Sequence, residues 1–490
     1  VDLGVMISAS HNPMPDNGIK FFAHGGYKLA DSVEDQIEAL VNTEWDRPTG
    51  DAVGEINADH AWAKDAYIAH LVEAIGTDLR GMKIAIDCAN GAASELGPAV
   101  FRELGADITV INASPDGRNI NLNAGSTHPE SLQAAVVEAG CDFGVAYDGD
   151  ADRCLAVDHE GNLIDGDKIM GALAVNAQQR GALAKDTLVV TVMSNLGLLI
   201  AMREAGINTV QTGVGDRYVL EEMLASGYSL GGEQSGHIIA RDQATTGDGI
   251  LSSLLVSRMV KESGRSLADL TSFIARLPQT LINVGGVDRA AASTNEAVAE
   301  AVAAAEARLG DTGRVLLRPS GTEPLVRVMV EAATQEEADA LASSLADVVK
   351  ASDEDIAWLF GVDTPVEEVM RRWSSQGPGL VVVTRGPWGA YARLSAERDM
   401  LVIDPLNVEV TDTVGAGDSF MGGLLSGLLD AGLLGSADAK KRLREATWND
   451  VRTALHRATI TSGLTVSHAG AYAPSLQEVN EVLIADPRLA

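Results

Sequence analysis

Short apolar runs alternate with longer amphipathic segments between residues 82 and 275. Buried strands are predicted at 82–87, 108–111, 143–147, 188–192 and 209–210, and segments with helical spacing follow them, one beginning near Arg217. Such alternation is typical of α/β domains with a parallel or mixed sheet. We therefore predict two consecutive α/β units, which look like structural repeats although their residues do not visibly repeat.

The residues before this region show a smaller pattern. The apolar runs Val5–Ile7 and Ile19–Phe22 flank a polar loop, and helical spacing follows at 31–45 and again around 60–75. The chain opens with Val1–Ile7, which we expect to lie inside a strand, and it has no initiator Met. We therefore expect the first unit to lack its front part.

Residues 281–349 have a different order of elements. The pattern predicts an Ala-rich helix at 295–309, strands at 315–318 and 325–331, and a helix at 336–349. Together these elements make a small α+β module.

After residue 350 another helix is predicted almost at once, with no Gly/Ser/Pro linker between the two. Ser352–Asp355 and Thr364–Glu367 each have the spacing of a capping box. A strand at 380–384, a hairpin through Tyr391 and a Gly-rich loop at 412–418 that opens an apolar helix follow. We therefore expect the residues from 350 onward to form a separate α/β unit.

Composition limits the possible partners. The 490 residues are enough for three to five domains, and 46% of them are hydrophobic, which is ample for buried cores. The net charge of −32 argues against nucleic-acid binding, so an anionic substrate has to be held by local Arg, Lys, backbone amides or metal. Three scattered cysteines fit neither a disulfide framework nor a zinc site, and no run suits a membrane span or signal peptide. These features favour a cytoplasmic protein without nucleic-acid or membrane partners, of unknown oligomeric state.

The polar loop between the first two apolar runs carries Ser10 and His11, with Lys20 close behind it. Two prolines and a glycine prevent the loop from continuing as strand or helix. A serine presented on such a turn beside a histidine and a lysine has the makings of a nucleophile or phosphate carrier. A plain Asn/Pro/Gly turn between strands would explain the same residues.

Three carboxylates, those of Asp148, Asp150 and Asp152, follow the strand predicted at 143–147. In extended or looped backbone this spacing places them on one side, whereas a helix would spread them around its axis. Oxygen-only ligation favours Mg²⁺. The alternatives are an acidic surface turn and an EF-hand calcium loop, but the sequence lacks the Gly at the sixth position and the distal Glu of the latter.

Two further loops suit a phosphorylated sugar. Gly231–His237 presents Glu233, Ser235 and His237 on a backbone freed by glycine, which suits sugar hydroxyls, although a plain strand-to-helix loop is the alternative. Arg318–Arg327 combines two arginines with donors suited to a phosphate dianion, although a β-turn with surface arginines would look similar.

These motifs occur in the order of the α-D-phosphohexomutases, which the chain resembles over about residues 1–349. The carriers of the resemblance are Ser8–Pro13, Asp148–Arg153, Gly232–His237 and Arg318–Pro324. Within that family the chain looks most like the bacterial phosphoglucosamine mutases, because of the stretches Asn119–Glu130, Met193–Gly197 and Gly213–Val219.

The resemblance implies a mutase that interconverts glucosamine 6-phosphate and glucosamine 1-phosphate through a phosphoserine and a bisphosphate intermediate. It implies a phosphoryl group on Ser10, which would bind Mg²⁺ together with the three aspartates, supported by Arg153. Lys20 and His237 become acid/base candidates, and Glu233 and Ser235 sugar contacts. The implied distal phosphate site consists of Arg318, Ser320, Gly321, Thr322 and Arg327.

The tail resembles the C-terminal half of ribokinase-like sugar kinases, close to fructokinases. Its carriers are Thr411–Phe420 together with Val381–Gly386 and Gly389. Glycines and backbone N–H groups at a helix N-terminus make an anion site. The resemblance makes Asp418 the base, Gly415, Ala416 and Gly417 the anion hole, and 384–389 part of an ATP site, whereas a structural Gly-rich helix start is the alternative.

The fold expected from both resemblances is α/β: a multi-domain phosphohexomutase with mixed-sheet domains and a small α+β domain, followed by a partial ribokinase-like unit. The expected divisions are 1–64, 65–165, 166–278, 279–349 and 350–490. We expect the kinase-like part to lack its sugar-binding half, which would leave an unpaired apolar sheet edge. Three hypotheses result: a phosphoglucosamine mutase, an ATP-dependent sugar kinase, and an inactive chimera of two partial enzymes that binds Mg²⁺ or phosphosugar without turnover.

Overall fold

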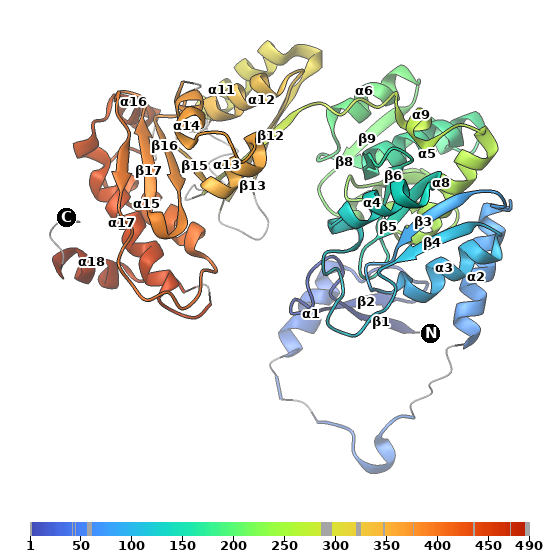
Figure 1. Ribbon diagram of the computed structural model, residues 1–490. Helices are drawn as coiled ribbons and strands as arrows, with labels where there is room; N and C mark the ends of the chain where they lie inside the picture. The colour runs from blue at the N-terminus through green and yellow to red at the C-terminus, as the bar shows by residue number, and fades with distance from the viewer. Residues whose placement is uncertain are drawn as a thin grey trace. The chain divides into compact units, whose positions relative to one another are not determined.

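The computed structural model divides the chain into two compact units, residues 1–276 and 277–490 (Figure 1). It describes residues 2–41, 43–44, 46–55, 61–285, 296–319, 325–345, 348–375, 377–434, 437–470 and 472–485. Within these ranges no helix combines the length and the apolar character needed to cross a membrane.

The first unit opens with the antiparallel hairpin of β1 (Leu3–Ser8) and β2 (Gly18–Ala23), in which Ser8 lies opposite Gly18. The polar loop predicted between them is therefore the hairpin loop. Two helices follow, α1 (Asp31–Val41) and α2 (Ala61–Ile75), with the short 3₁₀ turn Gly50–Ala52 between them. The first helix ends four residues before the predicted limit at 45.

The first large sheet has the mixed character that the sequence predicted. Strands β3 (Lys83–Asp87), β4 (Asp107–Ile111) and β5 (Phe143–Tyr147) are parallel, whereas β6 (Cys154–Asp158) and β7 (Leu163–Ile164) are antiparallel additions in the order β4-β3-β5-β6-β7. Its helices are α3 (Ala93–Glu103) and α4 (Glu130–Ala139), with a 3₁₀ turn at Gly125–Thr127. Because β5 is buried along its whole length, its end delivers the acidic loop from inside the unit.

The second sheet of this unit has the order β11-β10-β8-β9. Strands β8 (Thr187–Thr191), β9 (Asn208–Thr212) and β10 (Leu230–Gly232) are parallel, and β11 (Ile238–Ala240) runs antiparallel to β10. The helices are α5 (Gly166–Gln179), α6 (Leu196–Glu204), α7 (Asp216–Ser226), α8 (Gly249–Ser263) and α9 (Leu267–Thr271), with a 3₁₀ turn at Ala184–Asp186. One continuous apolar core runs through both sheets, so their loops are held in fixed positions relative to each other.

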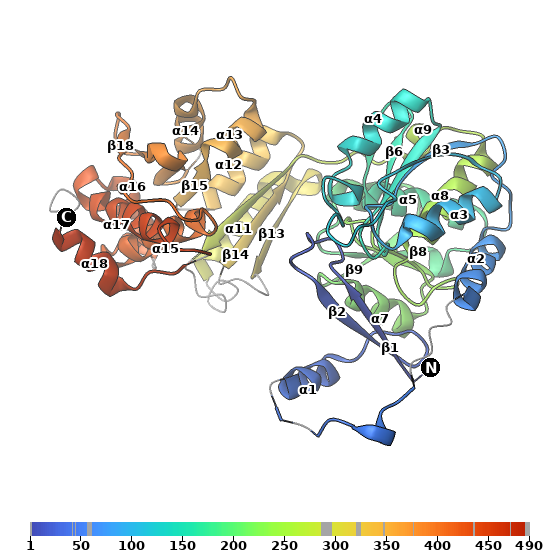
Figure 2. The same ribbon diagram turned by 60° about the horizontal axis from the view of Figure 1, so that its bottom comes forward.

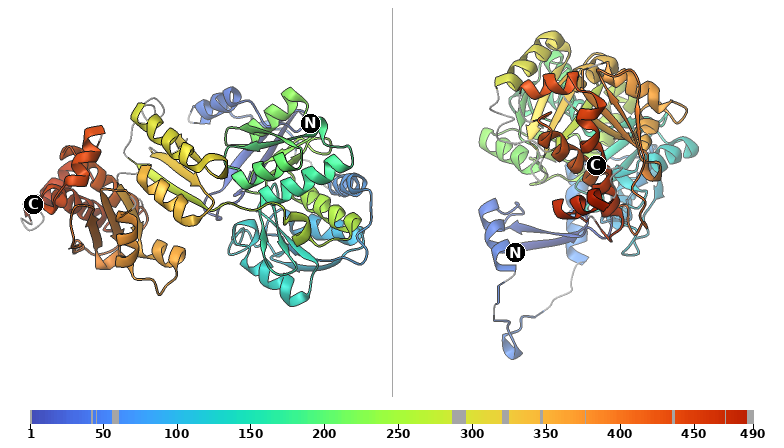
Figure 3. Two further views of the ribbon diagram at one scale, coloured as in Figure 1. Left: turned by 90° about the horizontal axis from the view of Figure 1, so that it is seen from above. Right: turned by 90° about the vertical axis from the view of Figure 1, so that its left-hand side faces the viewer.

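The second unit begins with the small α+β module. Its antiparallel sheet has the order β12 (Gln279–Gly285), β14 (Leu325–Glu331), β13 (Arg314–Pro319). Helices α11 (Glu296–Leu309) and α12 (Gln335–Leu345), drawn in yellow and light orange, pack on this sheet, and the 3₁₀ turn Gly310–Thr312 follows α11 (Figure 3).

The remaining residues build a four-stranded sheet in the order β15 (Val348–Ser352), β16 (Leu380–Thr384), β17 (Ala390–Leu394), β18 (Leu401–Ile403). Side chains of β16 alternate between two layers. Leu380 and Val382 join the core of α15 (Ala416–Asp430) and α17 (Trp448–Val466), whereas Val381 and Val383 face α13 (Asp353–Phe360) and α14 (Val366–Ser374). The two pairs of helices lie on opposite faces of the sheet (Figure 2). The other elements are a 3₁₀ turn at Gly386–Trp388, α16 (Ala437–Glu445) and α18 (Leu476–Ala485).

The helix predicted at 336–349 was wrong in its last part. Helix α12 ends at Leu345, and Val348 begins the strand β15, which pairs in parallel with β16. The β-branched Val348 and Val349 suit a strand, and pairing with the buried β16 provides partners for the backbone groups of β15 that point toward it. β15 is an edge strand whose valines are nevertheless buried, at 8% and 9% exposure.

Of the two predicted capping boxes only one forms. Ser352 Oγ accepts the Asp355 N–H at 3.0 Å, and Asp355 Oδ2 accepts the Ser352 N–H at 2.7 Å. In the second, the Thr364 hydroxyl donates to the Phe360 carbonyl instead, and α14 begins after Pro365 without a side-chain cap. Thr364 therefore closes the preceding helix and leaves α14 uncapped.

Candidate functional site

Ser10 lies in the left-handed backbone region, with a φ of 52°. Its carbonyl accepts the backbone N–H of Gly149 at 3.0 Å, so the hairpin loop is fastened to the acidic loop between β5 and β6. A side chain at Gly149 is excluded, because a Cβ there would lie 2.4 Å from the Ser10 carbonyl oxygen. The serine therefore lies beside the carboxylates, as the sequence predicted.

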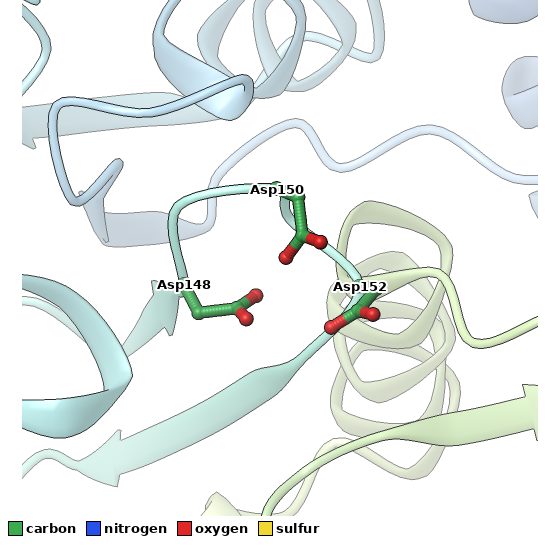
Figure 4. Close-up of side chains that lie close together, drawn as sticks. All are labelled: Asp148, Asp150 and Asp152. Atoms are coloured by element: carbon green, nitrogen blue, oxygen red, sulfur yellow. The ribbon is translucent and has the colours of Figure 1, made fainter. Parts of the chain in front are cut away.

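The carboxylates of Asp148, Asp150 and Asp152 converge in that acidic loop (Figure 4). One oxygen from each of the three lies within 4.8 Å of the others. Each residue also has a buried carboxylate oxygen that accepts no hydrogen bond from the part of the chain that the structure describes. Buried acceptors without a donor are costly, and a cation relieves that cost.

The pKa values of Asp148 and Asp152 are shifted in opposite directions. Burial, followed by the charges of Asp152 and Asp150, raises the pKa of Asp148 to about 8. Burial alone would also raise the pKa of Asp152, but a hydrogen bond and charge from His237, together with Lys20, hold it well below its usual range. Three carboxylates, each with one buried oxygen, form an oxygen donor set that fits Mg²⁺. Ligation by Ser10 stays a prediction.

The basic side chains of Lys20, on β2, and Arg153 lie next to the carboxylates of the acidic loop. The Lys20 ammonium lies 2.5 Å from Oδ2 of Asp150 and 3.2 Å from Oδ2 of Asp152. Burial would lower the pKa of Lys20, but these two carboxylates raise it. Arg153 lies less close, with Nε 4.0 Å from Oδ2 of Asp148. The structure thus brings both predicted cations to the carboxylates.

His237 also reaches the acidic loop, but it is only 3% exposed. Its Nδ1 lies 3.5 Å from Oδ2 of Asp152, and its Nε2 lies 3.3 Å from Oδ2 of Asp216 and accepts the Gly247 N–H at 3.1 Å. Lys28 pairs with Asp216 on the far side. Burial would raise the pKa of Asp216, but His237 and Lys28 lower it.

The sequence reasoning did not assign Asp216 or Lys28 to the site. Asp216 begins α7 directly after Gly213–Gly215. An acidic residue that follows two glycines was the sequence feature that could have marked it as a site residue. Lys28 carried no signal of its own.

The predicted sugar-binding loop lies directly against the acidic loop. The Gly236 carbonyl accepts the Cys154 N–H at 3.0 Å, and Glu233 Oε1 accepts the Gly215 N–H at 3.0 Å. The Ser235 Oγ atom is buried and makes no hydrogen bond within the described residues. Sugar binding by Ser235 stays a prediction.

Two arginines of the predicted phosphate site face each other in the second unit. Arg318 of β13 lies opposite Arg327 of β14. Partial burial, and then the charge of Arg327, lower the pKa of Arg318, which indicates concentrated positive charge. Such a pair suits a phosphate dianion. The other predicted members, Ser320, Gly321 and Thr322, lie outside the described residues.

The glycine-rich loop of the tail opens α15 as predicted. Gly415 caps the helix in the left-handed region, at φ 77° and ψ 0°, and Ala416, Gly417 and Asp418 form its first turn. Lys350 lies on β15 close to Gly417, where an added Cβ would be 3.1 Å from its Nζ. Burial lowers the pKa of Lys350 against the opposing charges of Asp355 and Asp418.

Family models match most of the chain. The model described as phosphoglucomutase/phosphomannomutase, alpha/beta/alpha domain I matches residues 1–47, that of domain II residues 65–161, and that of domain III residues 165–277. The pfkB family carbohydrate kinase model matches residues 281–478. This last match covers residues 281–349 of the module that the sequence motifs assigned to the mutase.

Among curated relatives, the phosphoglucosamine mutase of Bifidobacterium animalis subsp. lactis is 62% identical over 354 residues, which cover 71% of this chain and 78% of the relative. The phosphoglucosamine mutase of Streptomyces coelicolor is 58% identical over 356 residues, which cover 72% of this chain and 78% of the relative.

Two solved structures share the fold. Aspergillus fumigatus N-acetylphosphoglucosamine mutase, in complex with GlcNAc-6P and magnesium, has a TM-score of 0.56 at 21% identity, covering 70% of this chain and 88% of that one. A putative phosphomannomutase from Thermus thermophilus has a TM-score of 0.53 at 24% identity, covering 69% and 76%.

Three consecutive domain models and relatives of about 60% identity agree with the geometry of the serine and aspartate loops. Over its N-terminal 71%, the chain therefore belongs to the phosphoglucomutase/phosphomannomutase family, and within it to the phosphoglucosamine mutases.

Proposed function

We propose that the chain interconverts glucosamine 6-phosphate and glucosamine 1-phosphate through a phosphoserine and a bisphosphate intermediate. The observation that carries this proposal is the hydrogen bond from the Gly149 N–H to the Ser10 carbonyl, which places the serine beside the aspartates. A serine alone is a weak nucleophile, whereas one next to a cation-binding loop is suited to phosphoryl transfer.

In this proposal Ser10 Oγ donates a phosphoryl group to one end of the sugar phosphate and recovers one from the other end. Asp148, Asp150 and Asp152 would hold Mg²⁺, whose Lewis acidity would stabilise charge on the transferring group. Arg153, beside the same loop, would contact that group as a second cation.

The remaining residues of the first unit would bind the sugar and move its proton. Ser235, whose hydroxyl has no partner in the described part of the chain, and Glu233 would bind sugar hydroxyls. Lys20 and His237 are the proton-transfer candidates. The Lys20 side chain is 30% exposed and so accessible to a bound hydroxyl, whereas His237 is enclosed by two carboxylates and a backbone amide.

The distal phosphate would be held by Arg318 and Arg327, with Ser320, Gly321 and Thr322 completing the site. Support comes from the cross-strand pairing of Arg318 with Arg327 and from the effect of the Arg327 charge on the pKa of Arg318. Anchoring one phosphate while the other reacts would retain the bisphosphate in the site between the two transfers.

The test is incubation with glucosamine 6-phosphate, Mg²⁺ and a trace of glucosamine 1,6-bisphosphate, with Ser10→Ala as the control. The proposal expects glucosamine 1-phosphate to form and Ser10 to acquire one phosphate by intact mass, both only in the native chain. Phosphate uptake without product would support the chimera hypothesis. A chain that neither turns over nor takes up phosphate would overturn the proposal.

A second candidate function is phosphorylation of a sugar by ATP. It is favoured by the pfkB family match at 281–478 and by Asp418 in the first turn of α15, next to a glycine cap. Asp418 would take the proton of the attacking hydroxyl, and the backbone of Gly415, Ala416 and Gly417 would face the developing negative charge. Sugar-dependent ADP formation with fructose, abolished by Asp418→Asn, is the expected result, and sugar-independent ADP formation contradicts it.

A further inference from the structure

Asn121 joins the turn after β4 to the serine loop, although 111 residues separate it from Ser10. Its amide Nδ2 donates to the Ser10 carbonyl at 2.7 Å and to the Asn12 carbonyl at 2.8 Å. The side chain is 5% exposed, and its own backbone N–H is held by the Ala89 carbonyl at 2.9 Å. Asn121 therefore contacts the loop from a fixed, buried position.

The orientation of this amide is determined by its surroundings. The amide lies against two carbonyl oxygens, so the reverse orientation would place Oδ1 against both of them. Oδ1 accepts no hydrogen bond from any residue that the structure describes, so the side-chain hydrogen bonds go to the serine loop alone. The backbone of Asn121 has a φ of 57°, a region that asparagine tolerates better than most residues.

Ser10 itself is in a costly conformation, at φ 52°, which persists only where the surroundings enforce it. Gly149 donates to the Ser10 carbonyl, but only Asn121, among the described residues, donates from a side chain to Ser10 and Asn12 together. The two acceptors flank His11, so the amide holds the loop on both sides of His11.

We propose that Asn121 is a positioning residue for Ser10. It does not touch the substrate; it holds the backbone of Ser10 and Asn12 so that the serine hydroxyl stays at the acidic loop for phosphoryl transfer. The proposal rests on the proposed mutase function for its consequence in catalysis, but the clamp itself is a property of the folded chain.

The clamp is tested by amide hydrogen exchange in Asn121→Ala and Asn121→Asp. The alanine removes both donors, and the near-isosteric aspartate replaces them with an acceptor. The amides of Ser10, Asn12 and Gly149 are expected to exchange about tenfold faster or more in both variants. Amides of the buried strand β5 serve as an internal reference for global stability, and are expected to keep their native rates.

The matched control is Asn119→Ala. Asn119 stands two residues away, and its side chain bonds the Asp116 N–H at 3.0 Å and the Ser114 carbonyl at 3.0 Å, within its own segment. This variant is expected to leave the serine-loop amides protected. Unchanged protection in the Asn121 variants, or equal loss in Asn119→Ala, would overturn the clamp.

The catalytic consequence is measured by the rate at which Ser10 takes up phosphate from glucosamine 1,6-bisphosphate. Asn121→Ala is expected to slow uptake about tenfold or more while the dissociation constant for Mn²⁺ changes less than twofold. Native-like uptake despite a loosened loop would refute the positioning role. If the native chain takes up no phosphate, the proposed function fails, and the exchange experiment still decides the clamp.

Discussion

The ammonium of Lys20 lies 2.5 Å from Oδ2 of Asp150, so a lysine occupies part of the donor set suited to a divalent cation. The same ammonium lies 3.2 Å from Oδ2 of Asp152. A singly charged lysine and a divalent metal ion that share two carboxylates repel each other, and at about 4 Å this repulsion amounts to about 8 kcal/mol at an effective dielectric constant near 20.

Lys20→Met is therefore expected to tighten Mn²⁺ binding about tenfold or more, measured by electron paramagnetic resonance titration of free Mn²⁺. Lys28→Met is the matched control, because Lys28 pairs with Asp216 and not with the three aspartates. Weaker Mn²⁺ binding in Lys20→Met, or an equal effect of both substitutions, would contradict the prediction.

The raised pKa of Asp148 predicts that the stability of the metal-free protein depends on pH. Its pKa in the folded state is raised from 3.8 to about 8, so the folded state favours the protonated carboxyl. The associated stability is complete below pH 3.8 and is lost as the pH rises toward 8.

In EDTA, Asp148→Asn is expected to exceed the native chain in unfolding free energy at pH 8 by about 1 kcal/mol or more, with the difference shrinking toward pH 4. Denaturant unfolding at several pH values measures it. Adding Mn²⁺ is expected to reverse the order, because the cation stabilises the three carboxylates. A pH-independent difference between the two proteins would be inconsistent with a raised pKa.

The arginine pair of β13 and β14 predicts a specific effect on substrate affinity. Arg318→Gln is expected to raise KM for glucosamine 6-phosphate about tenfold or more with a smaller change in kcat, because a charged hydrogen bond to phosphate is worth about 1.5–3 kcal/mol. Steady-state kinetics measures the split. Arg308→Gln, at an exposed arginine on α11, serves as the control and is expected to be neutral. Equal kinetics of the two variants would remove Arg318 from the phosphate site.

Because the valines of β15 are buried, we expect the stability of the second unit to depend on the residues around 350. Val349, 9% exposed, packs in one cluster with Val381 and Val383. Val349→Ala is expected to cost about 2 kcal/mol, read from denaturant unfolding of the chain. Val402→Ala on β18, where the side chain is 59% exposed, is the control and is expected to stay within about 0.5 kcal/mol of the native chain. A small effect at Val349 would mean that β15 does not pack as described.

Most elements and the central loops were predictable from local pattern. Strand β5 and the acidic loop behind it follow from a short apolar run and the spacing of three carboxylates, which needs no long-range information. The serine loop is equally local, because prolines and a glycine interrupt two apolar runs. Family resemblance then supplied the roles that residue types alone left open.

What the sequence did not reveal depends on segments that meet only after folding. Lys28 and Asp216 are 188 residues apart, and no spacing rule connects them. Nothing in the sequence distinguishes Asn121 from the neighbouring Asn119 and Asn123. The end of α12 was misplaced because Val348 and Val349 continue a helical hydrophobic pattern, and only pairing with β16 converts them into a strand.

The position of β15 decides how the two halves of this chain can be studied separately. A cut at residue 350 would divide β15 and remove the strand that pairs with β16. The apolar edge of β16 would then be open to pairing with other chains, which promotes aggregation. A fragment that starts ahead of Val348 keeps the sheet whole. Anyone who expresses the kinase-like half alone should therefore begin it on the N-terminal side of that valine.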